Sequence, residues 1–298
     1  MDIIQELQKK KWGKVTPNIS MKDYTTYKAG GNAKALIEPD SIENLKQLIE
    51  WIKQNKIKYK IIGNGSNLLF SDQLFDGIII KLTKLDHLKI DGTLVQVGAG
   101  YSLMKLALKT AKMGLAGLEF AAGIPGTIGG SVFMNAGAYK SDMGYVVQTV
   151  TVLTDKLEIK QLSNQDMDFH YRSSFLQARP DYICIEATLK LRKYDSKTLM
   201  EIIQDRKLRR LETQPLEYPS AGSVFRNPEG DFAGRLIEEI GYKGKRIGGA
   251  CVSEKHANFI INDQNATSND IKKLVLEIQE KVKQKYGIQL KVEQEYVE

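Results

Sequence analysis

Apolar and polar residues follow two periods along this chain, and each period predicts one kind of element. Apolar residues three or four positions apart indicate amphipathic helices, and the clearest example follows Thr267. Asp270 completes a capping box with Thr267, the apolar face continues to Val282, and Gly287 ends the pattern. The same spacing predicts further helices at residues 2–11, 42–52, 103–113 and 197–214.

Short apolar runs and two-residue alternation predict strands. The tail alternates from Ile288 to Glu295, with apolar residues on one face and Glu293 and Glu295 on the other. A shift to strongly charged sequence near residues 193–200 predicts a boundary between two domains. The other predicted strands lie at residues 33–37, 59–62, 78–82, 94–97, 146–153 and 182–191.

The stretch 114–144 breaks both periods. It holds eight of the 25 glycines, separated by small side chains, so we expect neither a good core helix nor a good core strand. Glycine lets backbone N–H groups approach a bulky anion such as a diphosphate. A long tight loop without a ligand is the alternative, whereas apolar residues such as Leu118 and Phe133 argue against disorder.

Residues 63–68, Gly-Asn-Gly-Ser-Asn-Leu, follow a predicted strand and form a second glycine turn. A Rossmann fingerprint requires a third glycine at position 68, where this chain has leucine, and the glycines at 98 and 100 fail the spacing too. Two glycine-rich segments suit one long cofactor that carries phosphates. A flavin dinucleotide fits better than a nicotinamide dinucleotide held as a fixed cofactor.

The composition and net charge of the chain limit the classes of ligand that it is expected to bind. The 298-residue chain has a net charge of +7 and 42% hydrophobic residues, as expected for a soluble protein that attracts anions. Its lysines are spread out with no nucleic-acid-binding motif, so we favour small phosphorylated ligands over nucleic acid. Cys184, Cys251 and three separated histidines give no zinc or disulfide pattern. The charged N-terminus and the lack of a long apolar run predict a cytoplasmic protein without a membrane span.

Five motifs, in order and in register, carry a resemblance to a known family. They are GNGSNLL from Gly63, GLEFAAGIPGTIGGSVFMNAGAY from Gly117, YRSS from Tyr171, AGSVFRNP from Ala221, and AGRLIEEIG followed by KHANFIIN. With these motifs the chain resembles the UDP-N-acetylenolpyruvoylglucosamine reductase family over about residues 15–293. YRSSFLQ continues directly into Arg179, which is similar to the family's shorter subtype, without a mobile tyrosine loop over the substrate.

The resemblance implies an α+β fold, with a two-lobed FAD-binding domain of the vanillyl-alcohol-oxidase (PCMH) type followed by an α/β substrate-binding domain. The implied ranges are 1–20 for an N-terminal helix and lead-in, 21–195 for the FAD-binding domain and 196–298 for the substrate-binding domain. The implied enzyme is a UDP-N-acetylmuramate dehydrogenase with non-covalently bound FAD. It uses NADPH to reduce the enolpyruvyl ether of UDP-N-acetylglucosamine enolpyruvate in peptidoglycan precursor synthesis. A monomer with no metal, membrane or nucleic-acid partner is expected.

Arg172, Ser223 and Glu293 match the family's catalytic positions. Arg172 would bind the substrate carboxylate and stabilise an enolate-like charge, because a guanidinium stays protonated and can bind both oxygens. Ser223 would donate a proton to carbon, and Glu293 would help to polarise the carboxylate. The tail departs from the family, since Glu295 stands where a basic residue is usual, and Glu295 remains a rival for the catalytic carboxylate.

The resemblance also implies cofactor and substrate contacts. The cofactor residues it implies are Tyr27, Gly63, Asn64, Gly65, Ser66, Asn67, Leu68, Gly123, Pro125, Gly126, Thr127, Ile128, Gly129, Gly137, Ala138, Tyr139 and Ile185. Arg226, Asn227 and Arg235 would face the UDP diphosphate. Ordinary surface charge is the alternative for both arginines.

Two other functions remain open. Another FAD enzyme of the same fold, an oxidase or dehydrogenase of a small hydroxy compound, would share the first domain but would not need AGSVFRNP or a terminal glutamate. A non-enzymatic basic protein that binds nucleotides or nucleic acid predicts a colourless preparation, whereas a flavoprotein is yellow.

Overall fold

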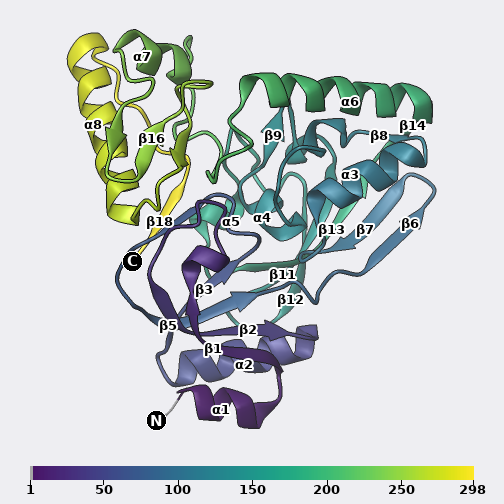
Figure 1. The fold of residues 1–298 in the computed structure, drawn as a ribbon. Helices are drawn as coiled ribbons and strands as arrows, with labels where there is room; N and C mark the ends of the chain where they lie inside the picture. The colour runs from purple at the N-terminus through teal and green to yellow at the C-terminus, as the bar shows by residue number, and fades with distance from the viewer. Residues whose placement is uncertain (1–2) are drawn as a thin grey trace. The chain divides into compact units, whose positions relative to one another are not determined.

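The computed structural model describes residues 3–298, which fold into two compact units. The first unit comprises the segment up to Pro17, Ala35–Asn64 and Gly77–Lys207. The second unit comprises Asn18–Lys34, Gly65–Asp76 and Leu208–Glu298. Each unit therefore combines segments that are far apart in the sequence (Figure 1). Asp2, which the prediction includes in the first helix, lies outside the described residues.

The domain ranges 1–20, 21–195 and 196–298 are contiguous and stay a prediction. The compact units differ from them because residues 18–34 and 65–76 belong to the same unit as the C-terminal third. These two segments are short and show no shift in composition. The sequence pattern therefore does not reveal that they pack with the C-terminal third of the chain.

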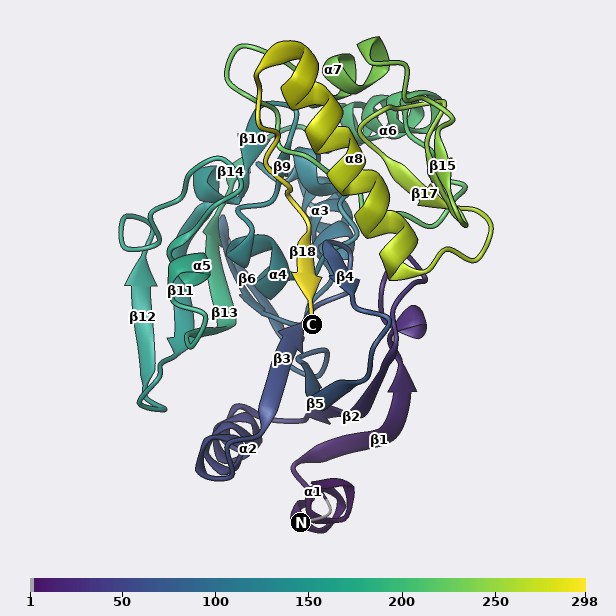
Figure 2. The same ribbon diagram turned by 90° about the vertical axis from the view of Figure 1, so that its left-hand side faces the viewer.

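The elements that lie wholly or mostly in the first unit form a five-stranded sheet, a four-stranded sheet and two two-stranded pairs, β9–β10 and β8–β14, together with helices (Figure 2). Its helices are α1 (Ile3–Lys10), α2 (Ile42–Gln54), α3 (Leu103–Lys112), α4 (Ile128–Phe133), α5 (Phe175–Ala178) and α6 (Ser196–Thr213). Its strands are β1 (Gly13–Ser20), β2 (Asn32–Pro39), β3 (Lys58–Ile62), β5 (Phe75–Lys81), β6 (Leu88–Asp91), β7 (Leu94–Gly98), β8 (Leu115–Ala116), β9 (Gly137–Ala138), β10 (Ser141–Asp142), β11 (Val147–Leu153), β12 (Ile159–Ser163), β13 (Ile183–Lys190) and β14 (Arg192–Lys193). The predicted helices and strands of this part of the chain are confirmed.

The larger sheet of the first unit is antiparallel, in the order β12-β11-β13-β7-β6. In β13, Ile183, Ile185, Ala187 and Leu189 alternate along the strand and are all buried in the core. Helix α4 packs against β13. The sheet thereby supports the glycine-rich stretch from which α4 comes.

The smaller sheet has the order β1-β2-β5-β3, and β3 runs parallel to β5. Helix α2 begins where the Ser41 side chain accepts the backbone N–H of Asn44 in its first turn. Its buried Leu48 and Ile49 belong to the same apolar cluster as Ile78 of β5. Strand β3 ends at Ile62, directly before the glycine turn.

The second unit has a small antiparallel sheet, a two-stranded parallel pair and two helices. Its elements are β4 (Leu68–Phe70), α7 (Ala233–Glu239), β15 (Arg246–Ile247), β16 (Ala250–Val252), β17 (Ile260–Asn262), α8 (Ser268–Tyr286) and β18 (Glu295–Val297). The face of α8 predicted to be apolar is buried throughout, from Ile271 to Val282. The capping box at Thr267 and the end of the helix at Gly287 are also confirmed, and Gly287 has a left-handed backbone.

The glycine-rich stretch is more regular than the sequence predicts. Helix α4 lies within it, Thr127 caps the helix, and Ile128 and Val132 are completely buried. The expectation that this stretch forms no core helix is therefore wrong. The helix fits because Gly129 lets it approach Ala99 so closely that an added Cβ would lie 2.9 Å from the Ala99 Cβ.

The predicted strand over the tail, residues 288–295, is also wrong. A strand forms only at β18, and Val292 makes an isolated bridge to Phe225. Val292 is exposed, whereas Gln294, two positions further along, is buried. The reason is that the tail has two short partners, first residues 224–226 and then β4, in place of one long strand.

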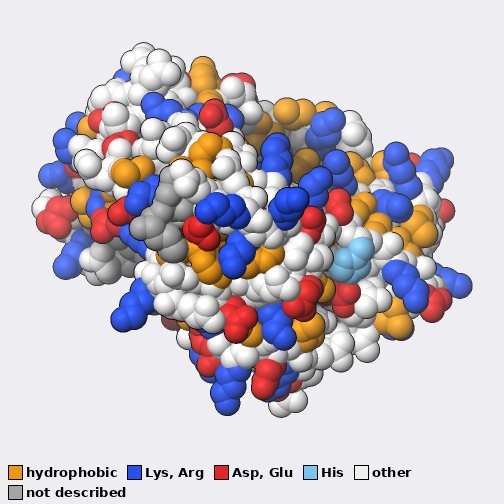
Figure 3. Space-filling view, turned by 90° about the horizontal axis from the view of Figure 1, so that it is seen from below, with side chains coloured by type: hydrophobic (Ala, Val, Ile, Leu, Met, Phe, Trp, Pro, Cys, Tyr) orange, Lys and Arg blue, Asp and Glu red, His pale blue; other side chains and the backbone are white. Residues whose placement is uncertain are grey.

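The surface carries charge of both signs. On the face in Figure 3, Lys and Arg side chains are scattered, with Asp and Glu among them. No helix within residues 3–298 combines the length and the apolar character needed to cross a membrane.

The capping box of α8 gives a prediction about stability. Thr267→Ala removes the side-chain acceptor of the Asp270 N–H without touching the core, so we expect a loss of about 1 kcal/mol of unfolding free energy. Urea unfolding measures this change. Thr213→Ala is the matched control, because that exposed hydroxyl only donates to the Arg209 carbonyl at the end of α6. Equal losses in the two variants would contradict the capping argument.

Candidate functional site

The first glycine turn and the glycine-rich stretch are packed together in the first unit. An added Cβ on Gly63 would lie 2.5 Å from the Thr127 hydroxyl, and the Asn64 side-chain amide donates to the Pro125 carbonyl at 3.1 Å. Only glycine permits this approach at position 63. Two segments that the sequence marks as cofactor-binding are therefore neighbours in space.

The rest of the turn lies in the second unit. Gly65 has a φ of +66°, and an added Cβ would lie 2.1 Å from the Tyr24 carbonyl oxygen. The Gly65 carbonyl accepts the N–H of Thr26 at 3.4 Å. Both the conformation and the space at position 65 therefore require glycine.

Two buried hydroxyls beside these segments have no hydrogen-bond partner among the described residues. One is the Oγ of Ser131, 2.8 Å from the Cβ that Gly126 would carry, and the other is the Oγ1 of Thr26. A buried hydroxyl without a partner costs about 1–3 kcal/mol. A group rich in acceptors, such as the phosphates of a dinucleotide, would offset that cost, so the residues present fit the expected FAD.

The YRSS loop is fastened to the glycine-rich stretch by side chains. Ser174 donates to the Phe133 carbonyl at 2.7 Å, and the Gln177 amide donates to the carbonyls of Phe133 and Arg172, each at 3.0 Å. The Asn135 amide donates to the carbonyl of His170 at 2.8 Å. These bonds hold an irregular loop against the end of α4.

Arg172 itself has a left-handed backbone, with a φ of +55°, which is uncommon for a residue with a side chain. Its Nη2 donates to the Gly137 carbonyl at 2.6 Å, and its guanidinium lies 5.0 Å from the centre of the Tyr171 ring. Such strain persists where the surroundings determine the conformation, and it concentrates at functional sites. The first unit thus brings a fixed cation to the predicted cofactor segment.

In the second unit, residues 224–226 pair with residues 291–293. The Glu293 N–H donates to the Val224 carbonyl at 2.8 Å, and the Arg226 N–H donates to the Lys291 carbonyl at 2.9 Å. This pairing places Ser223 and Glu293 on neighbouring segments.

Two asparagines fix these segments further. The Asn67 amide donates to the Glu293 carbonyl at 3.1 Å, and the Asn67 carbonyl accepts the Glu295 N–H at 2.9 Å. The Asn258 side chain bonds both the N–H and the carbonyl of Phe225, at 3.0 and 2.8 Å. Asn67 thus links the glycine turn to both candidate carboxylate positions within the second unit.

The predicted diphosphate contacts differ from one another. The Arg226 Nε is buried with no partner among the described residues, as expected of a group that awaits a ligand. Asn227 accepts the N–H of Ala233 at the start of α7. Arg235 pairs with Asp231 and Glu239, and its hydrogen bonds lower the pKa of Asp231 to about 2.

The predicted cofactor contacts divide between the units. Gly63, Asn64, residues 123–129 and 137–139, and Ile185 belong to the first unit, and Tyr27 and residues 65–68 belong to the second. Tyr27 and Ile185 are 0% and 1% exposed, and burial raises the pKa of Tyr27. Both residues stay predicted cofactor contacts. In the structure their side chains are buried in the apolar clusters of their units.

Sequence reasoning missed four polar residues at these segments: Thr26, Ser131, Asn258 and Gln294. Ser131 stands inside a quoted motif, so a search for hydroxyls within the glycine-rich segments could have found it. Thr26 lies outside the motifs and meets the glycine turn only in the folded chain. Asn258 lies inside the quoted KHANFIIN motif, but the motif does not reveal its bonds to the Phe225 backbone. Nothing in the spacing marks Gln294, because its partners belong to distant segments.

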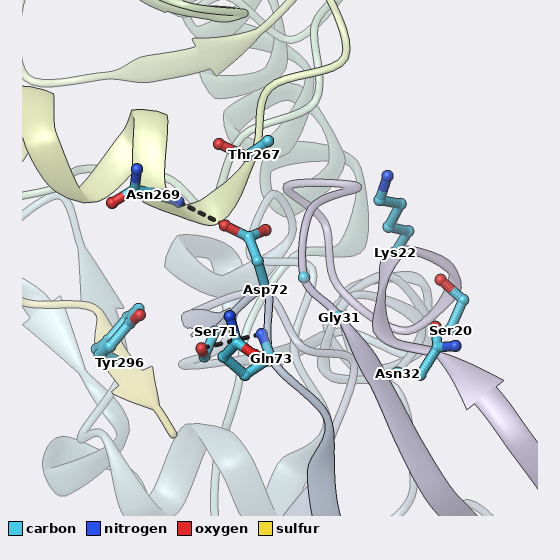
Figure 4. A pocket seen from close by; sticks show the side chains of 11 residues that line it. Ser20, Lys22, Gly31, Asn32, Ser71, Asp72, Gln73, Thr267, Asn269 and Tyr296 are labelled. Carbon is cyan, nitrogen blue, oxygen red and sulfur yellow. Dashed lines mark hydrogen bonds between the residues drawn. The ribbon is translucent and has the colours of Figure 1, made fainter.

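A separate depression of about 740 Å³ lies in the second unit (Figure 4). Asp72 accepts the backbone N–H groups of Ser268 and Asn269 there, each at 2.9 Å. The depression is lined by Ser20, Lys22, Gly30, Gly31, Asn32, Ser71, Asp72, Gln73, Thr267, Asn269 and Tyr296, and none of these is a predicted site residue. Within residues 3–298, no group of three or more His, Cys, Asp or Glu is arranged to hold a metal ion.

Comparisons with known proteins match almost the whole chain. Residues 214–297 match the family model described as UDP-N-acetylenolpyruvoylglucosamine reductase, C-terminal domain, and residues 33–163 match an FAD binding domain model. The reductases of that name from Bacillus licheniformis and Bacillus subtilis are 46% and 43% identical over 99% of this chain and 98% of each relative. The crystal structure of the reductase from Thermus caldophilus has 34% identity and a TM-score of 0.84, and the match covers 96% of this chain and 99% of that one.

The glycine turn gives a prediction about cofactor retention. Gly65→Ala places a side chain at positive φ against the Tyr24 carbonyl, so we expect it to cost more than about 1 kcal/mol and to lower the flavin bound per protein. Flavin absorbance of the purified protein measures the change. Gly92→Ala is the matched control, because Gly92 has a φ of +56° with no atom within 4 Å of its Cβ position. The same flavin loss in the control would contradict a local effect at the turn.

Proposed function

The chain belongs to the UDP-N-acetylenolpyruvoylglucosamine reductase family, and we propose that Arg172, Ser223 and Glu293 carry out the family's reaction in it. It is an NADPH-dependent flavoenzyme, a UDP-N-acetylmuramate dehydrogenase of peptidoglycan precursor synthesis. Its substrate is the enolpyruvyl ether of UDP-N-acetylglucosamine enolpyruvate, and its cofactor is FAD. The fold is α+β, with the PCMH-type FAD-binding domain of this family.

When bound, FAD would supply two-electron chemistry that connects hydride from NADPH to reduction of the substrate. The glycine turn and the glycine-rich stretch would hold the cofactor, and the hydroxyls of Ser131 and Thr26 would be available as donors to its phosphates. The close approaches at Gly63 and Gly65 support this proposal, because they keep the backbone of both segments in one conformation.

Arg172 binds the carboxylate of the enolpyruvyl group. When hydride adds to the methylene carbon, the electron pair of the double bond moves toward that carboxylate, and the guanidinium meets the developing charge. The bond from Arg172 to the Gly137 carbonyl supports the role, because it holds the cation in place before the reaction.

Ser223 completes the reduction by giving its hydroxyl proton to the carbon next to the methylene carbon. The serine oxygen then regains a proton from solvent, so hydride and proton together make the two new C–H bonds. A serine hydroxyl is a weak acid, and Glu293 assists by polarising the carboxylate that bears the charge. The observation that carries this assignment is the bond from the Glu293 N–H to the Val224 carbonyl, next to Ser223.

Two carboxylates compete for this role in the tail. Glu293 is held on both sides, by Val224 and by Asn67, whereas Glu295 begins β18 and pairs with Leu68. This difference supports Glu293, because its backbone is fixed beside the segment that carries Ser223.

The remaining assignments are also proposals. We infer an FAD-binding domain over residues 21–195 and a substrate-binding domain over residues 196–298, which the two family matches support. Arg226 and Asn227 face the diphosphate of the substrate. Arg235 also binds the diphosphate, and it gives up its ion pair with one carboxylate, Asp231 or Glu239, to do so. The enzyme works as a monomer in the cytoplasm.

The proton donor is tested by separating the two half-reactions. Ser223→Ala should leave flavin reduction by NADPH unchanged and slow reduction of the substrate by about 100-fold or more, because only the second half needs the proton. Stopped-flow absorbance follows both halves. Ser220→Ala, three residues earlier, is the matched control and should affect neither. Equal slowing of both halves in Ser223→Ala would remove the serine from this role.

The carboxylate is tested by comparing Glu293→Gln with Glu295→Gln. We expect the first to slow substrate reduction by at least about tenfold and the second to stay within about twofold of the unmodified enzyme, since only Glu293 lies beside the Ser223 segment. Single-turnover rates of the reduced enzyme measure both variants. Loss of activity in Glu295→Gln alone would assign the role to Glu295.

A further inference from the structure

A buried carboxamide lies between the two candidate carboxylates. Gln294 is 9% exposed, while its neighbours Glu293 and Glu295 are only partly buried. Burying an amide is costly unless its polar atoms are hydrogen-bonded. Position 294 follows Leu290 and Val292 at two-residue spacing, so the alternation of the tail predicts an apolar side chain there. The bonds that Gln294 makes therefore need an explanation.

Those bonds converge on the turn that carries Ser223. The Gln294 Nε2 donates to the Ala221 carbonyl at 3.1 Å, and it lies 3.4 Å from the carbonyl oxygens of Gly222 and Ser223. Gly222 has a φ of +73°, and nothing lies within 4 Å of its Cβ position. Gly222 has no side chain that could stabilise this turn. The Gln294 Nε2 instead lies within hydrogen-bonding distance of the three successive carbonyl oxygens of residues 221–223.

Tyr27 sets the orientation of that amide. Its hydroxyl donates to the Gln294 Oε1 at 2.9 Å, and the tyrosine is 0% exposed. Because the carbonyls of the turn can only accept, the amide must turn its nitrogen toward them and its oxygen toward the phenol. The Tyr27 carbonyl in turn accepts the side-chain amide of Asn262 in β17 at 2.8 Å. The pair is therefore anchored to the sheet of the second unit.

We propose that Gln294 and Tyr27 are positioning residues that brace the 221–223 turn and thereby aim the Ser223 hydroxyl for proton transfer. This inference rests on the proposed function of Ser223. Proton transfer to carbon depends steeply on the placement of the donor, and a misplacement of about 1 Å can slow a reaction about 100-fold. Without the brace, a turn centred on a glycine can move relative to the tail.

The variants remove one part of the brace at a time. Gln294→Leu removes both amide functions at similar volume, and Tyr27→Phe removes only the hydroxyl. Gln279→Leu is the matched control, because its amide donates to the Leu290 carbonyl of the same tail at 2.8 Å without contacting the turn. Each variant is purified with its flavin and its thermal unfolding is recorded.

We expect Gln294→Leu to slow the single-turnover reduction of substrate by about 10- to 100-fold, and Tyr27→Phe by about three- to tenfold. Flavin reduction by NADPH should stay within about twofold in Gln294→Leu, because Gln294 is not one of the predicted cofactor contacts. The solvent deuterium isotope effect on substrate reduction should rise in both, since proton transfer then limits the rate more strongly. A merely destabilised fold lowers the active fraction but does not change the isotope effect.

Amide hydrogen exchange gives a readout that is independent of activity. Exchange in the peptide that covers residues 219–226 should quicken in Gln294→Leu and in Tyr27→Phe, and should stay unchanged in Gln279→Leu. If Gln294→Leu does not fold, Tyr27→Phe still tests the brace. Unchanged exchange and an unchanged isotope effect in Tyr27→Phe would overturn the proposal.

A double-mutant cycle separates this inference from the proposed function. If Gln294 acts through Ser223, Gln294→Leu should slow substrate reduction little further in a Ser223→Ala background. A full additional loss would overturn the brace and leave the serine's role intact. If Ser223→Ala alone has no effect, the proposed proton donor is wrong, and the brace falls with it. If Ser223→Ala is slow but Gln294→Leu behaves like Gln279→Leu, only the brace is wrong.

Discussion

Where the backbone of this chain leaves helices and strands, its buried N–H and C=O groups still need partners, because each unpaired group costs about 1–3 kcal/mol. Carboxamide side chains supply these partners at the segments that carry the proposed chemistry. Asn64 bonds the glycine-rich stretch, Asn135 bonds the YRSS loop, and Asn258 and Gln294 bond the segment around Ser223. One amide offers donors and an acceptor together, so a single side chain can fix irregular backbone at two points.

Close packing of backbone against backbone is the second constraint, after the need of irregular segments for hydrogen-bond partners. The turn after β3 meets the glycine-rich stretch where Gly63 lies against Thr127, and Gly65 lies against the Tyr24 carbonyl. At neither position is there room for a side chain. Segments held this tightly lose their conformational entropy on folding, before a ligand arrives, and a site prepared in this way binds and stabilises charge without reorganising.

Each unit prepares its own share of the proposed chemistry. The first unit fixes a cation, Arg172, on the glycine-rich stretch through the Gly137 carbonyl. The second unit fixes a hydroxyl and a carboxylate on paired segments, with Asn67 bonded to the tail beside them. Irregular segments suit this task because they can present a side chain in directions that a regular strand does not allow, as the left-handed backbone of Arg172 illustrates.

Periodicity alone predicted helices α1, α2, α3, α6 and α8 and strands β2, β3, β5, β7, β11 and β13, because burial on one face imposes a repeat that local sequence records. Helix α8 shows this from its Thr267 cap to Gly287. The motifs likewise indicated Arg172, Ser223 and the glycine segments. Tertiary structure decided what no local pattern encodes. It made a helix of residues 128–133, limited the tail strand to β18, and gave Gln294 its buried partners. These outcomes depend on contacts between residues far apart in the chain, such as Tyr27 with Gln294, and a one-dimensional repeat carries no information about such pairs.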